Sequence, residues 1–251
     1  MEKLIYALWK KPDQPQEDFN ERLLGAVQKD LRNKGALRVQ FNVADSVIAT
    51  TIASQMWGSE IRVNLKPMPS AIVSFWLNSS HIRGPYEKLL EEACPRIAGY
   101  VASESTVIPY LEVINDGEKT PGFSQVAFIR RPPRLSPEAW LQQWLSTQTK
   151  LAGETQTIFH YCQNVVTRQL TYGAPHLDAI VEELWPTEAM MDPDIFFKGE
   201  GSMEKQKLNR ARQLENVAKF IDFDKCDLLY TSQYRFGQWI DITGQPSIES
   251  I

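Results

Sequence analysis

The chain has few cysteines and no long apolar run, and each of these features excludes a class of protein. Its three cysteines, Cys94, Cys162 and Cys226, are far apart and odd in number. This spacing argues against a disulfide framework and a zinc knuckle, and indicates reduced thiols in a cytoplasmic protein. No apolar run approaches the ~18–20 residues that a transmembrane helix needs. The run from Leu4 to Trp9 is too short for a signal peptide.

Basic residues are slightly outnumbered by acidic ones. Lys and Arg together number 27 and Asp and Glu 31, which gives a formal net charge of −4 over 251 residues. A dedicated nucleic-acid or anionic-membrane binder needs a basic surface that releases counterions. The sequence therefore predicts neither nucleic acid nor membrane as a partner. With 43% hydrophobic and 23% charged residues, the chain has an ordinary globular composition and can bury real cores.

Signatures of several enzyme classes are missing. The sequence has no Gly-x-Ser-x-Gly nucleophile elbow, no phosphate-binding glycine loop and no dinucleotide fingerprint. Its three histidines, His81, His160 and His176, do not show metal-ligand spacing. We therefore expect no metal site and no resident cofactor, and ATP- or NAD-dependent chemistry is disfavoured.

What the sequence does contain is a weak internal repeat. The segment Tyr6–Pro12 resembles Val126–Pro132 at an offset of 120 residues, and Tyr110 and Tyr230 show the same offset. A unit of ~120 residues is the size of a whole domain. The predicted organisation is a degenerate first copy at 1–117, a linker at 118–121, a second copy at 122–241 and an irregular arm at 242–251.

Hydrophobic periodicity indicates the order of elements in each copy. In the first copy we expect a strand at 4–11, a helix at 19–31, strands at 37–43 and 71–77, a helix at 86–98 and a strand at 107–113. In the second we expect a strand at 123–131, a helix at 136–151, strands at 157–167 and 179–185, a helix at 203–220 and a strand at 227–234. This order is typical of a ferredoxin-like sheet with both helices on one face.

Each such sheet would leave one face bare. Two copies in one chain can press their bare faces together and close the sheets into a barrel. The sequence therefore predicts an α+β fold in which two tandem ferredoxin-like repeats form an intramolecular dimeric α+β barrel around a shared hydrophobic interior.

The second copy resembles the EthD domain over nearly its whole length. The residues that carry the resemblance are Phe128–Arg131, Leu135–Trp140, Trp144, Tyr161–Val166, Asp178–Trp185, Phe220–Asp222 and Leu228–Tyr230. In the first copy it is carried mostly by the first strand and the helix around Phe19. EthD domains belong to the dimeric α+β barrel superfamily. Their relatives include cofactor-independent monooxygenases, cyclases and decarboxylases, so the resemblance implies small-molecule chemistry without choosing a reaction.

The chain departs from the family pattern where chemistry would be expected. Family members place one histidine on the first helix and another in the second strand, where this chain has Gln148 and Val165. Another histidine, His160, has a type of side chain that suits general acid/base work. The alternative is an imidazole with an ordinary structural hydrogen bond.

Several other residues could shape a ligand pocket. Trp140, Trp144 and Gln148 share one helix face, although they could equally pack the helix on the sheet. Tyr161 and Asn164 lie in the following strand, and Asn164 could donate to a ligand or mark a strand irregularity. The cluster Arg130–Arg134 could bind an anionic tail or form a solvated turn.

Two functional hypotheses follow. In the first, the chain is a cofactor-independent enzyme of monooxygenase, cyclase or decarboxylase type. Its small hydrophobic or aromatic, oxygenated ligand would be oriented by Trp140, Trp144, Gln148, Tyr161 and Asn164, and His160 would move the proton. In the second, the chain is a non-catalytic binding or accessory protein that has lost the family's histidines. A homodimer is left open.

Overall fold

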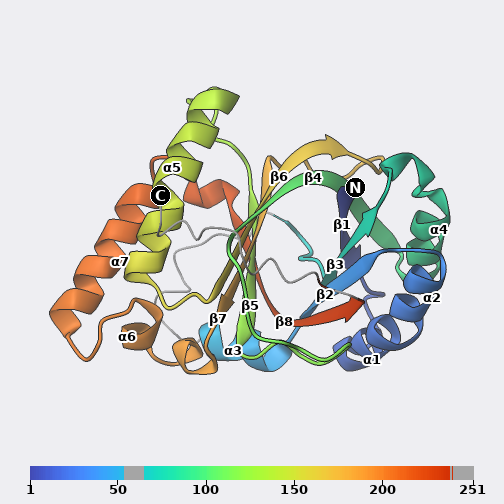
Figure 1. Cartoon of the computed structure of the whole chain (residues 1–251), viewed down its shortest axis with the longest axis horizontal. Coiled ribbons are helices and arrows are strands. Elements are labelled where there is room, and N and C mark those ends of the chain that lie inside the picture. Colours follow the sequence, from blue (N-terminus) through green and yellow to red (C-terminus); the bar gives the residue numbers. More distant parts are fainter. Residues whose placement is uncertain (54–64, 238, 240–251) are drawn as a thin grey trace.

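The centre of the molecule is a closed antiparallel barrel (Figure 1). The structure is a computed structural model and describes residues 1–53, 65–237 and 239. The strands follow the order β1-β3-β2-β8-β5-β7-β6-β4 around the barrel. Their bounds are β1 Glu2–Trp9, β2 Arg38–Ala44, β3 Ala71–Leu77, β4 Arg96–Ile108, β5 Phe123–Ile129, β6 His160–Gln169, β7 Ala179–Trp185 and β8 Asp227–Gly237.

Helices cover the barrel on two opposite sides, with α1, α2 and α4 on one and α5 and α7 on the other (Figure 1). The α-helices are α1 Gln16–Arg22, α2 Gln28–Asn33, α3 Ser46–Ala53, α4 Gly84–Ala93, α5 Pro137–Thr155, α6 Pro193–Phe196 and α7 Met203–Val217. A π-helical turn, η1 Leu23–Val27, joins α1 to α2. The 3-10 turns are η3 Ser80–Ile82, η4 Thr187–Met190 and η5 Phe223–Lys225.

The prediction of an α+β fold with a closed barrel is confirmed. Within the first half the strands lie in the order β4-β1-β3-β2, and within the second in the order β8-β5-β7-β6. The two sets of strands join where β2 pairs with β8 and where β4 pairs with β6. Since every strand has two neighbours, the barrel has no exposed edge.

Two boundaries in the first half were predicted wrongly. The helix predicted at 86–98 ends at Ala93, and the strand predicted at 107–113 is β4, which begins at Arg96. Pro95 follows the end of the helix, and proline disfavours helical backbone at the residue before it. Helix α3 was not predicted. The predicted arm at 242–251 lies outside the described residues.

The offset of 120 residues does not match the faces of the first strands. Leu8 of β1 packs under the helices, whereas Phe128, the residue 120 positions later, lies inside the barrel. The pairing with the third strand gives the same result, because Leu8 lies opposite Ala71 and Ile129 lies opposite Ala179. A shift of one residue turns every side chain to the other face. The sequence alignment of these two strands was therefore wrong by one position.

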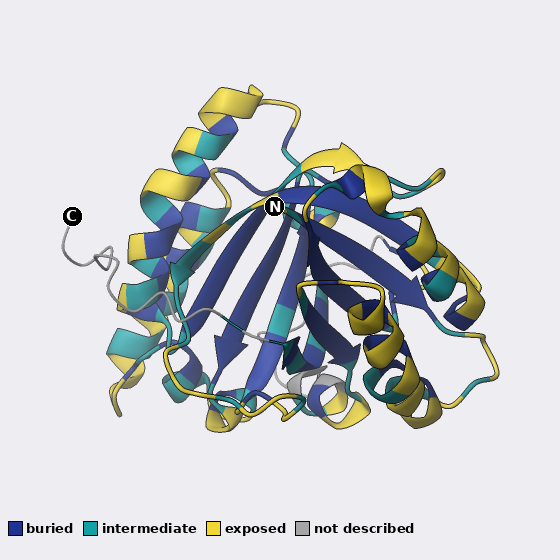
Figure 2. Ribbon diagram, turned by 45° about the vertical axis from the view of Figure 1, so that its right-hand side comes forward, coloured by how far each residue is buried: buried dark blue, intermediate teal, exposed yellow. Residues whose placement is uncertain are grey.

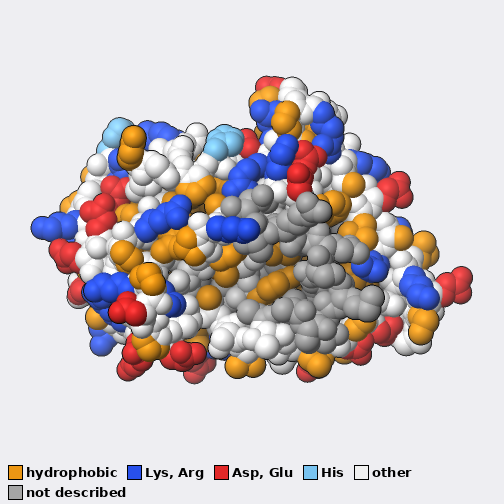
Figure 3. All heavy atoms as spheres, turned by 180° about the vertical axis from the view of Figure 1, so that it is seen from behind, with side chains coloured by type: hydrophobic (Ala, Val, Ile, Leu, Met, Phe, Trp, Pro, Cys, Tyr) orange, Lys and Arg blue, Asp and Glu red, His pale blue; other side chains and the backbone are white. Residues whose placement is uncertain are grey.

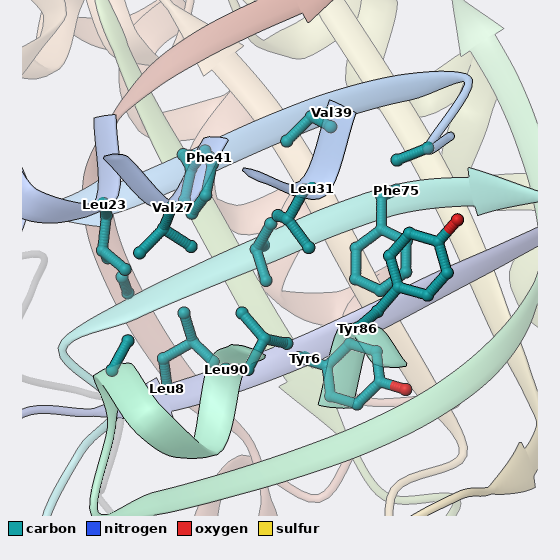
Figure 4. Close-up of a cluster of buried hydrophobic side chains, with 14 of the residues drawn as sticks. Tyr6, Leu8, Leu23, Val27, Leu31, Val39, Phe41, Phe75, Tyr86 and Leu90 are labelled. Carbon is teal, nitrogen blue, oxygen red and sulfur yellow. The ribbon is translucent and has the colours of Figure 1, made fainter. Parts of the chain in front are cut away.

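Helix-covered cores lie on both sides of the barrel. In the first half, leucine, valine and phenylalanine side chains from β1, β2 and β3 meet those of α1, η1, α2 and α4 (Figure 4). In the second half, the aromatic side chains of α5, including Trp140 and Trp144, meet β5, β6 and β7. The strands are almost wholly buried, while the helices expose their outer faces (Figure 2).

The interior of the barrel forms a third core and is divided into two ends. At one end Ile5, Ala7, Tyr100, Phe128 and Ile180 pack together, with Trp9 and Leu65 beside them. At the other end the inward side chains are polar or charged: Lys3, Gln40, Asn42, Glu104, His160, Cys162, Asn164, Glu182, Gln233 and Arg235. The predicted hydrophobic interior is therefore correct for one end only.

Candidate functional site

The residues predicted to form one site lie in two different layers. Trp140, Trp144 and Tyr161 belong to the helix-covered core of the second half, and Gln148 lies beside them between α5 and α7. His160 and Asn164 alternate with Tyr161 along β6, so they point into the barrel. The β-sheet separates the two groups, and a small ligand cannot contact both at once. Whether either group binds a ligand stays a prediction.

A row of polar side chains crosses the helix-covered face of the second half. In register from strand to neighbouring strand it consists of Tyr230 on β8, Gln125 on β5, Glu183 on β7 and Tyr161 on β6. Gln125 donates a hydrogen bond from Nε2 to Oε2 of Glu183 at 2.9 Å. We call these four residues the polar row.

Glu183 is the ionisable group of the polar row whose pKa is displaced toward neutrality. Its residue is 8% exposed, and no cation among the described residues forms an ion pair with it. Burial raises the pKa of this carboxyl to about 7, and the hydrogen bond from Gln125 offsets only part of that effect. A carboxyl of this kind can both accept and return a proton near neutral pH.

Aromatic side chains of α5 cover the polar row. The indole of Trp144 donates from Nε1 to the hydroxyl of Tyr161 at 3.1 Å, and Trp140 donates to the carbonyl of Phe220 at 2.9 Å. The two indoles lie 5.1 Å apart between ring centroids. Burial raises the pKa of Tyr161, which keeps its hydroxyl protonated.

Gln148 is held by an amide network between α5 and α7. Its Nε2 donates to Oε1 of Gln213 at 3.0 Å, and its Oε1 accepts from Nδ2 of Asn216 at 2.9 Å. Gln213 donates in turn to Thr155 and to Gln156. Both polar ends of Gln148 are thus occupied by protein groups, which indicates that this side chain fixes the packing of the two helices.

Lys3 is the centre of the polar end of the barrel interior. Its ammonium lies 3.0 Å from Glu182 and 2.9 Å from Glu104. Burial acts against the charged form, but Cys162, Glu182 and Glu104 outweigh it and raise the pKa of Lys3. Asn164 donates to Glu182 at 3.0 Å, and Gln40 also donates to that carboxylate. Asn164 therefore stabilises the carboxylate of an internal ion pair.

His160 lies in the same interior cluster beside a cation. Nη2 of Arg235 is 3.4 Å from its Nε2. Burial, reinforced by the positive charge of Arg235, lowers the pKa of His160 to about 3. The imidazole is therefore neutral at physiological pH and is a weak base. Cys162 is also buried, and burial raises the pKa of its thiol to about 12, so it is not a reactive thiolate.

The arginines of 130–134 are occupied by protein groups. Arg130 pairs with Asp227 at 3.0 Å, and Arg134 pairs with Asp222. The guanidinium of Arg131 donates to the carbonyl of Leu135. These contacts favour the turn interpretation of this segment over an anion site.

A groove of about 430 Å³ lies on the surface of the first half between α2 and α4. Its lining includes Asp30, Lys34, Lys88 and Glu92, so charges of both signs face it. No aromatic side chain is among its lining residues. On the rear face of the molecule, acidic and basic side chains are likewise interspersed (Figure 3). The groove does not have the composition of an apolar ligand pocket.

Within the described ranges, no three His, Cys, Asp or Glu side chains are grouped as metal ligands. In the same part of the chain, no helix has the length and apolar character to cross a membrane.

Sequence reasoning missed Lys3, Glu182, Glu183 and Arg235. Glu182 and Glu183 interrupt an apolar strand, and that interruption was the available signal, because a central strand rarely buries an acid without a role. Lys3 and Arg235 sit near the ends of strands, where charged residues usually face solvent. Nothing in their local sequence marks them as buried.

The comparisons with known proteins find likeness in structure alone. No protein-family model and no curated protein matches the chain. An anthrone oxidase-like protein superposes with a TM-score of 0.54 at 10% identity, over 96% of this chain and 95% of the other. A candidate monooxygenase from Lactobacillus acidophilus NCFM gives a TM-score of 0.49 at 9% identity, over 94% and 96% of the two chains. The first likeness supports the fold, an α+β arrangement around a closed antiparallel barrel.

Proposed function

We propose that the chain is a cofactor-independent enzyme that transfers a proton on an apolar, oxygenated aromatic substrate. The reaction would take place at the polar row of the second half. The observation that carries the proposal is Glu183, a carboxyl buried without a cation and with a pKa of about 7. General acid/base catalysis works best when the pKa of the group is close to the operating pH.

Glu183, and not His160, is the group that would take the proton from the substrate. An imidazole with a pKa of about 3 binds a proton too weakly to remove one from a substrate near neutral pH. Tyr161 and Tyr230 flank Glu183 in the row and can donate hydrogen bonds to a substrate oxygen. The indoles of Trp140 and Trp144 provide an apolar cover for an aromatic ring.

Access to Glu183 requires movement of the covering helices, because the residue is only 8% exposed. The contacts between α5 and α7 include the amide hydrogen bonds of Gln148, Gln213 and Asn216. An ion pair also joins Arg212 of α7 to Glu154 of α5. Such contacts can re-form with water, so separating these helices exposes less apolar surface than separating two apolar helices. We propose that substrate enters between them.

A monooxygenase-type reaction fits this site without a bound cofactor. The carboxylate of Glu183 takes a proton from a methylene carbon that is conjugated with a carbonyl through an aromatic ring, and the electron pair is delocalised as an enolate. The enolate is oxidised by dioxygen, and recombination with protonation gives a hydroperoxide. The hydroperoxide then loses water, which carries away the second hydrogen of that carbon, and a new carbonyl remains. The likeness in fold to an anthrone oxidase-like protein suggested anthrone as the probe.

The finer description of the fold is part of the same proposal. We propose that the two halves are tandem ferredoxin-like repeats of EthD type, with the boundaries predicted at 1–117 and 122–241. The matching strand orders β4-β1-β3-β2 and β8-β5-β7-β6 support duplication. The first half would be mainly structural.

The test is oxygen consumption by the full chain with anthrone, after subtraction of the uncatalysed reaction. We expect Glu183→Gln to reduce the rate by on the order of 10²-fold or more, since it removes a general base. Phe75→Leu is the matched control, because Phe75 occupies the corresponding position of the first half, and it should retain the rate.

Other outcomes assign different roles. Full activity of Glu183→Gln would contradict the proposed base. If His160→Ala abolished the rate without unfolding the chain, the proton would belong to His160 as predicted from the sequence. Stabilisation by anthrone without turnover would favour the alternative of a ligand-binding or accessory protein.

A further inference from the structure

Among the described residues, the polar end of the barrel interior and its mouth together have one more positive charge than negative charges. The cations are Lys3 and Arg235 in the interior and Arg38 at the mouth, and the anions are Glu104 and Glu182. Lys3 forms close ion pairs with the carboxylates of both Glu104 and Glu182. Neither Arg38 nor Arg235 forms an ion pair with any residue that the structure describes. Since His160 is neutral, one cation is left without a matching anion.

Arg235 is the cation whose surroundings are most unusual. Its Nε donates to Oε1 of Gln40 at 3.3 Å, and its Nη2 lies 3.4 Å from Nε2 of His160. Burial lowers the pKa of this guanidinium, which means that the site does not fully replace the water it lost. The carboxylates of Glu182 and Glu104 partly oppose this effect, but neither forms a close ion pair with Arg235. A partly buried cation without a close anion is costly to the folded protein.

Two buried N–H groups near Arg235 also have no partner among the described residues. They are Nε2 of Gln233, a residue that is 1% exposed, and Nε1 of Trp239. Because Arg235 donates to Nε2 of His160, the imidazole hydrogen lies on Nδ1, and the backbone of Ile108 is its partner. A buried donor without an acceptor, as at Gln233 and Trp239, is destabilising.

Two indoles and two guanidinium groups form the mouth of this end. The rings of Trp76 and Trp239 lie 5.2 Å apart and edge to face. Arg38 lies over Trp76 at 4.7 Å, and Arg235 lies over Trp239 at 4.8 Å. The side chain of Glu104 at the same end is 25% exposed, so this end communicates with solvent.

We propose that the polar end of the barrel binds the carboxylate of a small aromatic acid. One negative charge would balance the excess cation. A carboxylate offers only acceptors, which matches the guanidinium of Arg235 and the unpartnered amide N–H groups of Gln233. The ring of the acid would lie against Trp76 and Trp239. This site is on the opposite face of the sheet from Glu183 and is independent of the proposed reaction.

The test is isothermal titration of the full chain with benzoate, acetate and inorganic phosphate. We expect benzoate to bind and acetate to bind more weakly, because acetate lacks the ring. Arg235→Gln should weaken benzoate binding at least about tenfold, as expected for loss of a charged hydrogen-bond donor. Arg96→Gln is the matched control: Arg96 also lies over an indole, that of Trp9 at 4.0 Å, but at the other end of the barrel.

Several results would overturn the proposal. These are the absence of benzoate binding, equal binding by the wild-type chain and Arg235→Gln, or equal loss in Arg96→Gln. Phosphate binding as tight as benzoate binding would refute the assignment to an aromatic carboxylate. If circular dichroism shows that Arg235→Gln is unfolded, the more accessible Arg38→Gln decides, and unchanged benzoate affinity in that variant would count against the site.

Discussion

The same cross-strand row has opposite chemistry in the two halves of the molecule. In the first half the row reads Val101, Leu4, Phe75 and Val39 across β4, β1, β3 and β2. In the second it reads Tyr230, Gln125, Glu183 and Tyr161 across β8, β5, β7 and β6. Topology and register correspond, so the difference lies in the side chains alone.

The comparison teaches where to look for function in a barrel whose two halves have the same strand order. An apolar row is sufficient to hold helices on a sheet, as the first half demonstrates. The second half places a carboxyl without a cation at the equivalent position and thereby loses stability. Departures from the simplest stable solution are expected at functional sites. This reasoning favours the second half as the reactive one.

The largest effect is expected when a carboxyl is placed in the first half at the position that corresponds to Glu183. Phe75→Glu should destabilise the fold by about 4 kcal/mol or more, because it removes a buried ring and buries an acid without a hydrogen-bond partner. Phe75→Leu should cost far less. Urea unfolding of both variants measures the difference, and equal losses would mean that the first layer tolerates polar groups.

A second test concerns the interior rather than the helix-covered layers. Glu182→Leu should destabilise by about 3–5 kcal/mol, since it removes a close partner of the buried Lys3. The double variant with Lys3→Met should recover much of that loss, because the buried cation is then removed as well and Glu104, whose side chain is 25% exposed, can be solvated without it. Denaturant unfolding provides the free energies. A double variant as unstable as the single one would refute the pairing argument.

The pH dependence of stability sharpens the assignment of Glu183. Its pKa rises from the usual 4.5 to about 7 on folding, so the folded state holds the proton more tightly. The contribution of this group is fully present below pH 4.5 and is lost as the pH rises through about 7. The loss amounts to about 3 kcal/mol. Glu183→Gln should remove this dependence between pH 4.5 and 8, and an unchanged slope in urea unfolding would contradict the raised pKa.

The smallest expected effect concerns how the first helix of each half begins. Ser136 accepts a hydrogen bond from the backbone N–H of Ala139 at the start of α5, whereas Pro15 before α1 offers no such bond. Ser136→Ala should therefore cost about 1 kcal/mol. Ser146→Ala, on the exposed side of α5, is the control and should stay within about 0.5 kcal/mol. Thermal unfolding would distinguish the two variants. Equal shifts in melting temperature would mean that Ser136 does not stabilise α5 as an N-cap.

Predicting the fold from the sequence worked where periodicity was strong. The segments 71–77 and 179–185 were placed as strands with the bounds of β3 and β7. The start of β4 was missed because Ile97 to Ala102 is apolar on both faces, and such a run looks alike in a helix and in a strand. The candidate site was only partly predictable. The sequence places His160, Tyr161 and Asn164 on one strand, but a strand pattern does not show which groups each face of the strand contacts.

By itself, the sequence determined the α+β class and predicted the closed barrel, because the order of strands and helices depends on local hydrophobic patterns along each element. Only the tertiary structure decided that Lys3 meets Glu182 across 179 positions, and that Glu183 lies beneath α5 without a cation. The physical reason is that a pKa and an ion pair depend on which groups come within a few ångströms. Strand register and barrel closure set those distances, and no single segment encodes them.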